Sequence, residues 1–325
     1  PGMRASIRHD TENWSFWTSP FEDSGEHLGI RGGSFLQLRI TLHSEEFDTL
    51  IRLDSLWIDN APILADRVIA EVARRDQPNP MRGFSQVELG EKTEFVYSLK
   101  ANFVRSDETG FDAVKISTGS PAEFRGLEIG EPPIVVEPTI VKEGEDELIV
   151  HLPQRIEAEN NLLVRIFFDV KIFSLAWNFA SEVMDLQTAS LSQPVMSGDT
   201  GDYIGTDKLL VLGRTVFDSR PLRRLNFSTD VITPDDDGIN DAVTINYTLF
   251  KIIDPIPAFL AIYALDGRII ARRELGALRF GSHSITWDGR DEKGDLLAPG
   301  IYIVGINLMA GTPVGQILRP IGVVY

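Results

Sequence analysis

The residues best suited to chemistry lie in one short acidic segment in the last third of the chain. Asp235, Asp236, Asp237 and Asp241 place four carboxylates within seven residues, with Gly238 among them. Carboxylate and amide oxygens on alternating positions of a loop are the ligands that Ca²⁺ prefers, and a glycine allows the sharp turn that such a loop needs. Carboxylates this close repel one another unless a cation or strong donors neutralise them. The segment is therefore predicted to bind calcium.

The predicted ligand set follows from the spacing of the oxygen-bearing residues. The side chains of Asp235, Asp237 and Asn240 can point inward from the loop. The carbonyl of Ile239 and the carboxylate of Asp241 can complete the shell. The alternative interpretation is an Asp- and Asn-rich turn that binds no metal.

The elements that must position this loop have the patterns of strands and turns. Residues 242–249 alternate apolar and polar side chains, as a half-buried strand does. Residues 262–270 are typical of a β-hairpin with Asp266-Gly267 in the turn. The C-terminal region is therefore expected to consist of strands joined by tight turns.

Four ordered motifs in this region resemble those of a known domain family. They are Thr233-Pro234-Asp235-Asp236-Asp237-Gly238-Ile239-Asn240-Asp241, Ile262-Tyr263-Ala264-Leu265-Asp266-Gly267, Trp287-Asp288-Gly289-Arg290-Asp291-Glu292-Lys293-Gly294 and Pro299-Gly300-Ile301-Tyr302. In this order they resemble the immunoglobulin-like (fibronectin III-like) domain related to that of the flagellar hook-capping protein. The resemblance covers residues 225–325. It departs at Asp235-Asp236, where the family more often has Asn-Gly, so this loop carries more charge.

The resemblance carries expectations about fold and role. It implies an Ig-like domain over residues 225–325, with Trp287 in its core beside the Asp288-Gly289 turn. Domains of this family end many large bacterial secreted proteins, where they serve as stalks, spacers, or sorting and anchoring modules. An extracellular or cell-surface location is thus implied.

The region before the linker is also rich in strand patterns. Residues 34–213 hold about ten alternating or apolar runs, which predict one large β-sandwich or two small ones with a possible break at 131–133. Long runs occur at 35–42, 95–104 and 162–173. The last is the most apolar and is predicted to be central. Residues 65–75 fit a helix or a strand, and their context favours a strand. The fold class is all-β, with tandem sandwiches.

Two segments flank this region. Residues 1–33 combine aromatic side chains, including Trp14 and Trp17, with several glycines, and are predicted to form an N-terminal arm. The arm either caps this protein's own core or docks on a neighbouring molecule by strand addition. Residues 214–224 hold four arginines and are predicted to be a basic linker.

The composition excludes several classes of protein. A net charge of −17 argues against nucleic acid and anionic lipid as partners. The chain has no cysteine, so disulfides, thiol catalysis and Cys-zinc sites are excluded. No apolar run approaches the length of a membrane span, so none is expected.

No convergent catalytic motif is present. The five histidines are scattered without metal-ligand spacing, and His43-Ser44-Glu45-Glu46 holds triad residue types at adjacent positions, where alternate side chains of a strand face opposite ways. Asp199 and Asp202 fit either a second cation site or a solvated turn. We expect no enzymatic activity.

Three functions are compatible with these observations. The favoured one is a structural, adhesive or assembly protein of a bacterial surface, with a calcium-stabilised Ig-like domain and an arm that can link copies into a filament or surface layer. The second is a carbohydrate-binding module of a larger polysaccharide-degrading protein, with Trp14, Trp17 and Trp57 as candidate glycan contacts. The third is a fragment of an enzyme whose catalytic part is missing.

Overall fold

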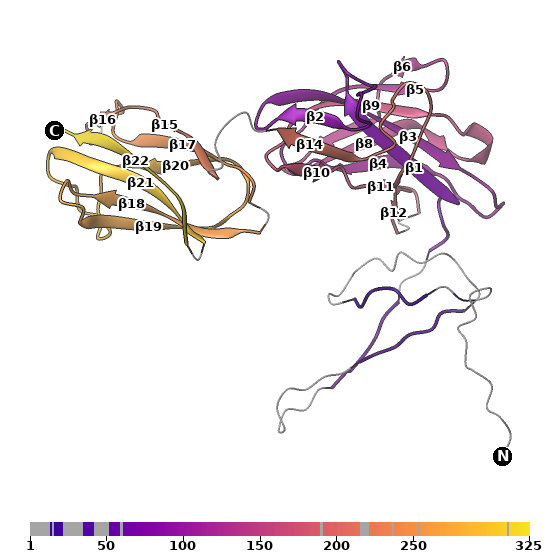
Figure 1. Ribbon diagram of the computed structural model, residues 1–325, viewed down its shortest axis with the longest axis horizontal. Coiled ribbons are helices and arrows are strands. Elements are labelled where there is room, and N and C mark those ends of the chain that lie inside the picture. Colours follow the sequence, from indigo (N-terminus) through magenta and orange to yellow (C-terminus); the bar gives the residue numbers. More distant parts are fainter. Residues whose placement is uncertain are drawn as a thin grey trace. The chain divides into compact units, whose positions relative to one another are not determined.

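The computed structural model describes most of the chain and divides it into two compact units, residues 1–58 and 59–325 (Figure 1). The described residues are 14, 16–21, 35–41, 52–58, 61–188, 191–214, 221–235, 237–252, 254–310 and 312–325. Most of the predicted N-terminal arm and of the basic linker lies outside them. The described part holds no helix with the length and apolar character that crossing a bilayer requires.

The described residues of the first unit form no strand. Residues 35–41 and 52–58 are irregular and exposed, although the alternating pattern of residues 35–42 predicts a strand. A strand needs a neighbour to complete its backbone hydrogen bonds, and within the described residues these segments have none. Trp17 contacts the guanidinium of Arg39, which lies 4.6 Å from the centre of the indole ring.

The second unit begins with a β-sandwich of three sheets. The six-stranded sheet has the order β13 (Met196–Ser197), β1 (Arg67–Arg74), β3 (Lys92–Asn102), β9 (Val164–Lys171), β5 (Glu123–Ile129) and β6 (Ile134–Val136). The five-stranded sheet has the order β12 (Gln193–Pro194), β11 (Ser181–Met184), β4 (Phe111–Ser117), β8 (Glu147–Ile156) and β7 (Ile140–Glu143). A small sheet follows the order β10 (Ala176–Asn178), β14 (Leu210–Arg214) and β2 (Ser85–Glu88), and one 3₁₀ helix, η1, spans Ala158–Asn160.

One hydrophobic core holds this sandwich together. Fully buried aromatic side chains meet in it: the ring centres of Phe95 in β3 and Phe168 in β9 lie 5.3 Å and 5.6 Å from that of Phe179, which lies between β10 and β11. Residues 131–133 form the turn between the paired strands β5 and β6, so they do not separate two domains. The segment 65–75 forms the strand β1, as its context predicts. The run 162–173 forms β9, which lies between β3 and β5 and is central, as predicted.

A strap covers the outer face of the six-stranded sheet. Residues 198–208, which join β13 to β14, cross this face, and Ile204 packs there against Ala73, Val96 and Phe167. The buried carboxylate of Glu71 in β1 accepts four hydrogen bonds from the strap: from the N–H groups of Thr200, Thr206 and Asp207 and from the hydroxyl of Thr200. The apolar residues Ala73, Val96 and Phe167 on this outer face are therefore covered by the chain itself.

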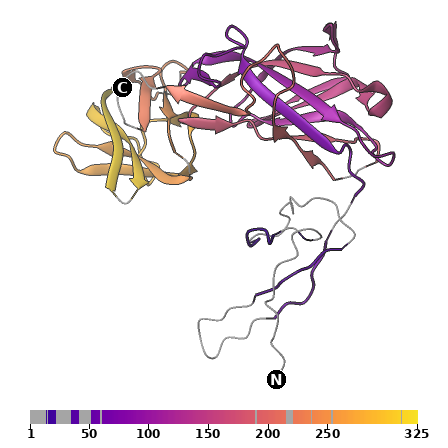
Figure 2. The same ribbon diagram turned by 45° about the vertical axis from the view of Figure 1, so that its right-hand side comes forward.

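The C-terminal part of the unit is a second sandwich of two sheets (Figures 1 and 2). The small sheet has the order β15 (Leu222–Phe227), β17 (Val243–Leu249) and β20 (Gly281–Trp287). The large sheet has the order β16 (Val231–Ile232), β22 (Thr312–Val323), β21 (Gly300–Ala310), β18 (Ile256–Tyr263) and β19 (Ile269–Leu278). The predicted strand and hairpin form as β17 and as β18–β19, and Gly267 occupies the turn with a φ of 87°. The two layers enclose a core of their own.

The second sandwich starts earlier than the sequence boundary at 225. Leu222 is 1% exposed and pairs with Leu249 across β15 and β17. A fragment that begins at Leu225 loses this buried side chain, and truncation of a buried leucine costs about 2–5 kcal/mol. We expect the fragment 221–325 to unfold cooperatively and the fragment 225–325 to melt at a clearly lower temperature, measured by circular dichroism. Equal melting temperatures would show that the start of β15 contributes nothing to this sandwich.

Candidate metal centre

The acidic loop connects the two sheets of the second sandwich. β16 ends at Ile232, at the edge of the large sheet, and β17 begins at Val243, at the centre of the small one. Ile232 and Val243 are both fully buried in the shared core. The two ends of the loop are therefore anchored in opposite layers.

Thr233 closes the loop. Its backbone N–H donates to the carbonyl of Asn240 at 2.8 Å, and its hydroxyl donates to the carbonyl of Ile239 at 2.9 Å. Gly238 has a φ of 86° and Asn240 a φ of 57°, in the left-handed region where glycine and asparagine are the residues best tolerated. Residues 233 and 240 are thus held side by side, and the acidic residues lie on the curve between them.

Three carboxylates converge within this curve. One oxygen each from Asp235, Asp237 and Asp241 lies within 4.8 Å of the others. Asp241 accepts hydrogen bonds from the N–H groups of Asp235 at 3.2 Å and Gly238 at 2.8 Å. Asp237 accepts from the N–H of Ile239 at 2.7 Å. These donors orient the carboxylates, but each N–H carries only a partial charge, so they do not neutralise three full negative charges.

The arrangement fits part of the predicted ligand set. Asp235, Asp237 and Asp241 come together, and their oxygens suit a hard cation such as Ca²⁺, which takes six to eight oxygen ligands. Ile239 already accepts the Thr233 hydroxyl through its carbonyl, which leaves it one free lone pair. Asn240 is exposed within the same loop. Water would have to supply several of the remaining ligands, because two of the three carboxylates are exposed.

A second loop, the turn at Asp288-Gly289, packs against the acidic loop. Gly289, with a φ of 75°, lies so close to Ile232 that a Cβ added there would be 2.8 Å from the Ile232 Cδ1 atom and 3.5 Å from the Pro234 Cγ atom. Trp287 is 5% exposed and donates from its indole N–H to the carbonyl of Arg290, so it is a core residue, as predicted. Residue spacing does not reveal the supporting roles of Thr233 and Gly289. The sequence signal that points to them is their fixed place in the family motifs.

Among the described residues, the other candidates from the sequence do not come together as sites. Asp199 accepts the N–H of Gly201 at 2.8 Å, which is the geometry of a solvated turn. His43, Ser44, Glu45 and Glu46 lie outside the described residues. Trp14, Trp17 and Trp57 are exposed, Trp57 by 84%, and no ring contact in the described residues joins two of them.

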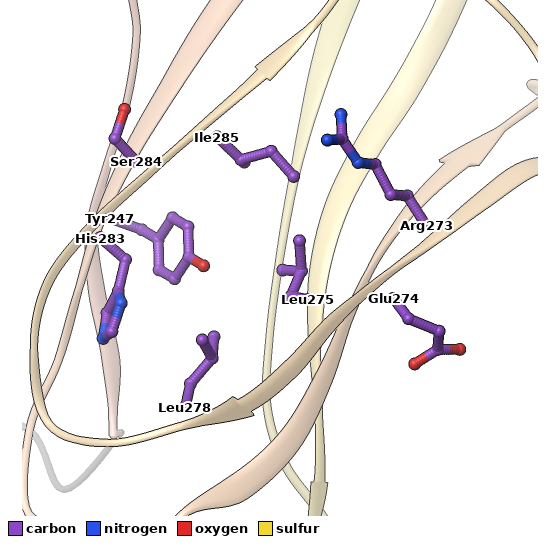
Figure 3. A pocket seen from close by; sticks show the side chains of 8 residues that line it. All are labelled: Tyr247, Arg273, Glu274, Leu275, Leu278, His283, Ser284 and Ile285. Atoms are coloured by element: carbon purple, nitrogen blue, oxygen red, sulfur yellow. The ribbon is translucent and has the colours of Figure 1, made fainter.

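A shallow hollow of about 300 Å³ lies between the edge strands β19 and β20 (Figure 3). The ring of Tyr247 lies among Leu275, Leu278 and Ile285, and Arg273 reaches from β19 to donate a hydrogen bond to the carbonyl of Thr286 in β20 at 3.2 Å. Burial raises the pKa of Tyr247 to about 12, so its hydroxyl stays protonated at neutral pH. The imidazole of His283 stacks on Tyr247 but hydrogen-bonds the carbonyl of Arg279. The hollow is lined by polar as well as apolar groups, and the polar groups make up more of its surface.

Comparison with protein families decides the nature of this sandwich. Residues 237–311 match the model of the FlgD Ig-like domain family. The C-terminal sandwich is an Ig-like domain of this family. The match begins inside the acidic loop and ends after β21, so it includes all the motifs that carry the resemblance except the start of the first. No curated protein sequence matches the chain.

Solved structures resemble the chain only distantly. Latent PorU from Porphyromonas gingivalis aligns at 11% identity and a TM-score of 0.27 over 79% of this chain and 34% of its own. A structure named BspA_C_mut aligns at 9% identity and a TM-score of 0.28 over 82% of this chain and 99% of its own. The BSP domain of a biofilm-associated protein aligns at 11% identity and a TM-score of 0.22 over 79% of this chain and 51% of its own. The chain spans about a third of the length of PorU.

Proposed function

We propose that this chain is a non-catalytic structural or adhesive protein of a bacterial cell surface, whose Ig-like domain is stabilised by calcium. The observation that carries the proposal is the carboxylate trio of Asp235, Asp237 and Asp241 in the loop that joins the two sheets. A divalent cation there would neutralise the repulsion and hold the start of β17 to the end of β16. Calcium is the cation that suits this oxygen-only donor set, and it is plentiful outside cells.

The same proposal includes self-association through the N-terminal arm, residues 1–33. Trp14, Phe16 and Trp17 are 41%, 74% and 48% exposed, and such side chains are costly to leave in water. An extracellular location agrees with a chain that has no cysteine to be oxidised and a net charge of −17 that keeps it soluble.

Binding to a glycan is the second candidate function. It is favoured by the exposed indole of Trp57, since exposed aromatic rings are the usual platforms for sugar rings. The absence of stacking between the described tryptophans favours the structural role instead.

Removal of calcium tests the proposed function. Because the ion binds the folded form preferentially, we expect chelator to lower the melting temperature of the second sandwich, with a stabilisation of about 2.7 kcal/mol when free Ca²⁺ is 100-fold above the dissociation constant. Asp237→Asn keeps an acceptor for the N–H of Ile239 but removes one charge, and should abolish the difference. The control is Asp254→Asn, an exposed carboxylate of the same domain away from the loop. Identical melting curves with and without Ca²⁺ would refute the proposal.

A further inference from the structure

The second sandwich has an open side where the edges of its two sheets run next to each other. β19 is the last strand of the large sheet, and β20 is the last strand of the small sheet. The hollow of about 300 Å³ lies between these two strands, which residues 279–280 join (Figure 3). Within the described residues, neither strand has a partner on this side. We name this side of the sandwich the seam.

The backbone groups of β20 that face the seam can be identified from their neighbours. The carbonyl of Thr286 accepts a hydrogen bond from Arg273 in β19 at 3.2 Å, so it points into the seam. Its partner in β17, Thr244, points the other way, because its N–H and carbonyl form hydrogen bonds with the segment between β15 and β16. In an antiparallel pair this direction repeats at every second residue. The N–H and carbonyl groups of Ser282 and Ser284 therefore also face the seam, and in the described part of the chain they have no partner.

Tyr247 adds a buried hydrogen-bond donor to the seam. The residue is 3% exposed, and its hydroxyl makes no hydrogen bond with any described residue. Figure 3 shows the hydroxyl directed toward the space between Leu275 and Leu278. Because burial raises the pKa of Tyr247 to about 12, the hydroxyl keeps its proton at neutral pH and can donate it in a hydrogen bond. Buried polar groups usually have a partner, so this hydroxyl points to an acceptor that a bound molecule supplies.

The seam is basic, although the chain as a whole carries a net charge of −17. Arg273 and Arg279 have no carboxylate partner within the described residues. The one carboxylate that lines the hollow, Glu274, is paired with Arg272. Two arginines without a carboxylate partner favour a negatively charged ligand at this side of the domain.

We propose that the seam binds an extended acidic peptide segment of another protein, which adds a strand to the edge of β20. An extended backbone presents a donor and an acceptor to one side about every 6.8 Å, since each residue advances it by about 3.4 Å. This spacing matches the unpartnered groups of Ser282 and Ser284, which are two residues apart. In strand addition, such backbone hydrogen bonds give the affinity, and pockets for alternate side chains give the specificity.

The hollow beside this edge specifies two side chains of the peptide. A large apolar side chain would pack against Leu275, Leu278 and Ile285. The next side chain on the same face of a strand lies two residues along, and a carboxylate there would accept hydrogen bonds from the Tyr247 hydroxyl and from Arg273. An apolar residue and an acidic residue in alternation also agree with a lining in which polar groups exceed apolar ones.

Other occupants fit the seam less well. A small molecule would leave the backbone groups of Ser282 and Ser284 without partners. The segment 35–41 of this chain has the alternating pattern of a strand, but it holds Arg39 and no carboxylate, so its charge is the wrong one for the seam. A foreign acidic segment meets both requirements.

Fluorescence anisotropy with the full chain and a synthetic heptapeptide tests the proposal. The peptide has threonine at its odd positions and phenylalanine, glutamate and valine at the second, fourth and sixth. It carries a fluorophore at one end and an amide at the other. We expect saturable binding with a dissociation constant on the order of 100 µM, as in weak and transient contacts. The same peptide with glutamine in place of glutamate, and a peptide of residues 35–41, should bind at least about tenfold more weakly.

Two variants of the protein, with a matched control, locate the peptide. Ser284→Pro removes an N–H that faces the seam, at an edge position where proline leaves the pairing with β17 intact, and should raise the dissociation constant about tenfold or more. Ser284→Ala changes only the side chain and should leave binding unchanged. Tyr247→Phe removes the unpartnered hydroxyl and should weaken binding about tenfold. Circular dichroism melts check the fold of all three.

Four outcomes would overturn the proposal. The first is no binding at protein concentrations up to about 500 µM. The second is binding that Ser284→Pro and Tyr247→Phe weaken no more than Ser284→Ala does, which would place the peptide elsewhere. The third is equal binding of the glutamine peptide, and the fourth is tighter binding of the peptide 35–41, which would make the seam a site for this chain itself. The acidic loop takes no part in the seam, so the calcium result is independent of all four.

Discussion

Replacing Glu71 by glutamine should lower the stability of the first sandwich by about 3 kcal/mol. In the wild type, Oε1 of Glu71 accepts hydrogen bonds from both the N–H and the hydroxyl of Thr200 at 2.8 Å. Oε2 accepts hydrogen bonds from the N–H groups of Thr206 at 3.2 Å and Asp207 at 3.0 Å. A glutamine has only one acceptor oxygen. Its amide group would face donors, and at least one buried donor would be left without a partner.

The loss of stability in Glu71→Gln should be visible in thermal unfolding and in amide hydrogen exchange. For a sandwich of this size, a loss of about 3 kcal/mol lowers the melting temperature by about 6–12 °C. The amides of Thr200, Thr206 and Asp207 should exchange faster, because the carboxylate no longer holds the strap to β1. Glu145→Gln is the control, since Glu145 lies exposed in the turn between β7 and β8 and should change stability by less than about 0.5 kcal/mol. A variant Glu71→Gln as stable as that control would mean that the strap is held by its apolar contacts alone.

The parts of the fold that the sequence predicts correctly are those encoded locally. The alternation in residues 95–104 and 242–249 appears as β3 and β17, and Asp266-Gly267 lies in the turn of a hairpin. The acidic trio of the loop is likewise a matter of spacing within seven residues. Period-two patterns and turn chemistry need no knowledge of the rest of the chain.

The features that the sequence does not reveal depend on contacts far along the chain. Glu71 has the pattern of a solvent-facing residue in an alternating strand, and it is buried only because Thr206, 135 residues later, crosses above it. In the segment 35–41 the opposite happens: the pattern predicts a strand, and the structure does not form one. It alternates as clearly as β3, but no partner strand lies beside it in the described residues. A sequence pattern specifies which face of a strand is apolar, and not whether a neighbour will cover it.

The ion pair between Arg155 and Asp185 should give the first sandwich a stability that disappears in acid. Arg155, in β8, donates from Nη1 and Nη2 to the two oxygens of Asp185, both at 2.9 Å. Asp185 also accepts from the hydroxyl of Thr188 at 2.7 Å and from the N–H of Gln187 at 3.0 Å. Its side chain is fully buried. The Arg155 guanidinium, followed by these hydrogen bonds, holds the pKa of the Asp185 carboxyl far below its usual value.

The sign of the pH dependence follows from the direction of this shift. Because the folded-state pKa lies below that of the unfolded chain, acidification protonates Asp185 first in the unfolded state and so favours unfolding. The stabilisation is complete at neutral pH and declines once the pH falls below the unfolded-state pKa of about 3.9. Asp185→Asn removes it at every pH, and breaking a buried pair costs about 3–5 kcal/mol.

The free energy of unfolding can be measured by urea denaturation at several pH values. The proteins to compare are wild type, Asp185→Asn and the exposed control Asp202→Asn. We expect a gap of about 3 kcal/mol between wild type and Asp185→Asn at pH values near 7, which narrows steadily below about pH 4. Arg155 keeps its hydrogen bonds to the carbonyls of Thr109 and Gly110 in the variant, so the guanidinium is not left without acceptors and the loss should stay near the lower end of the range. A gap that is the same at about pH 7 and at about pH 3 would show that Asp185 acts through its shape and hydrogen bonds rather than through its charge.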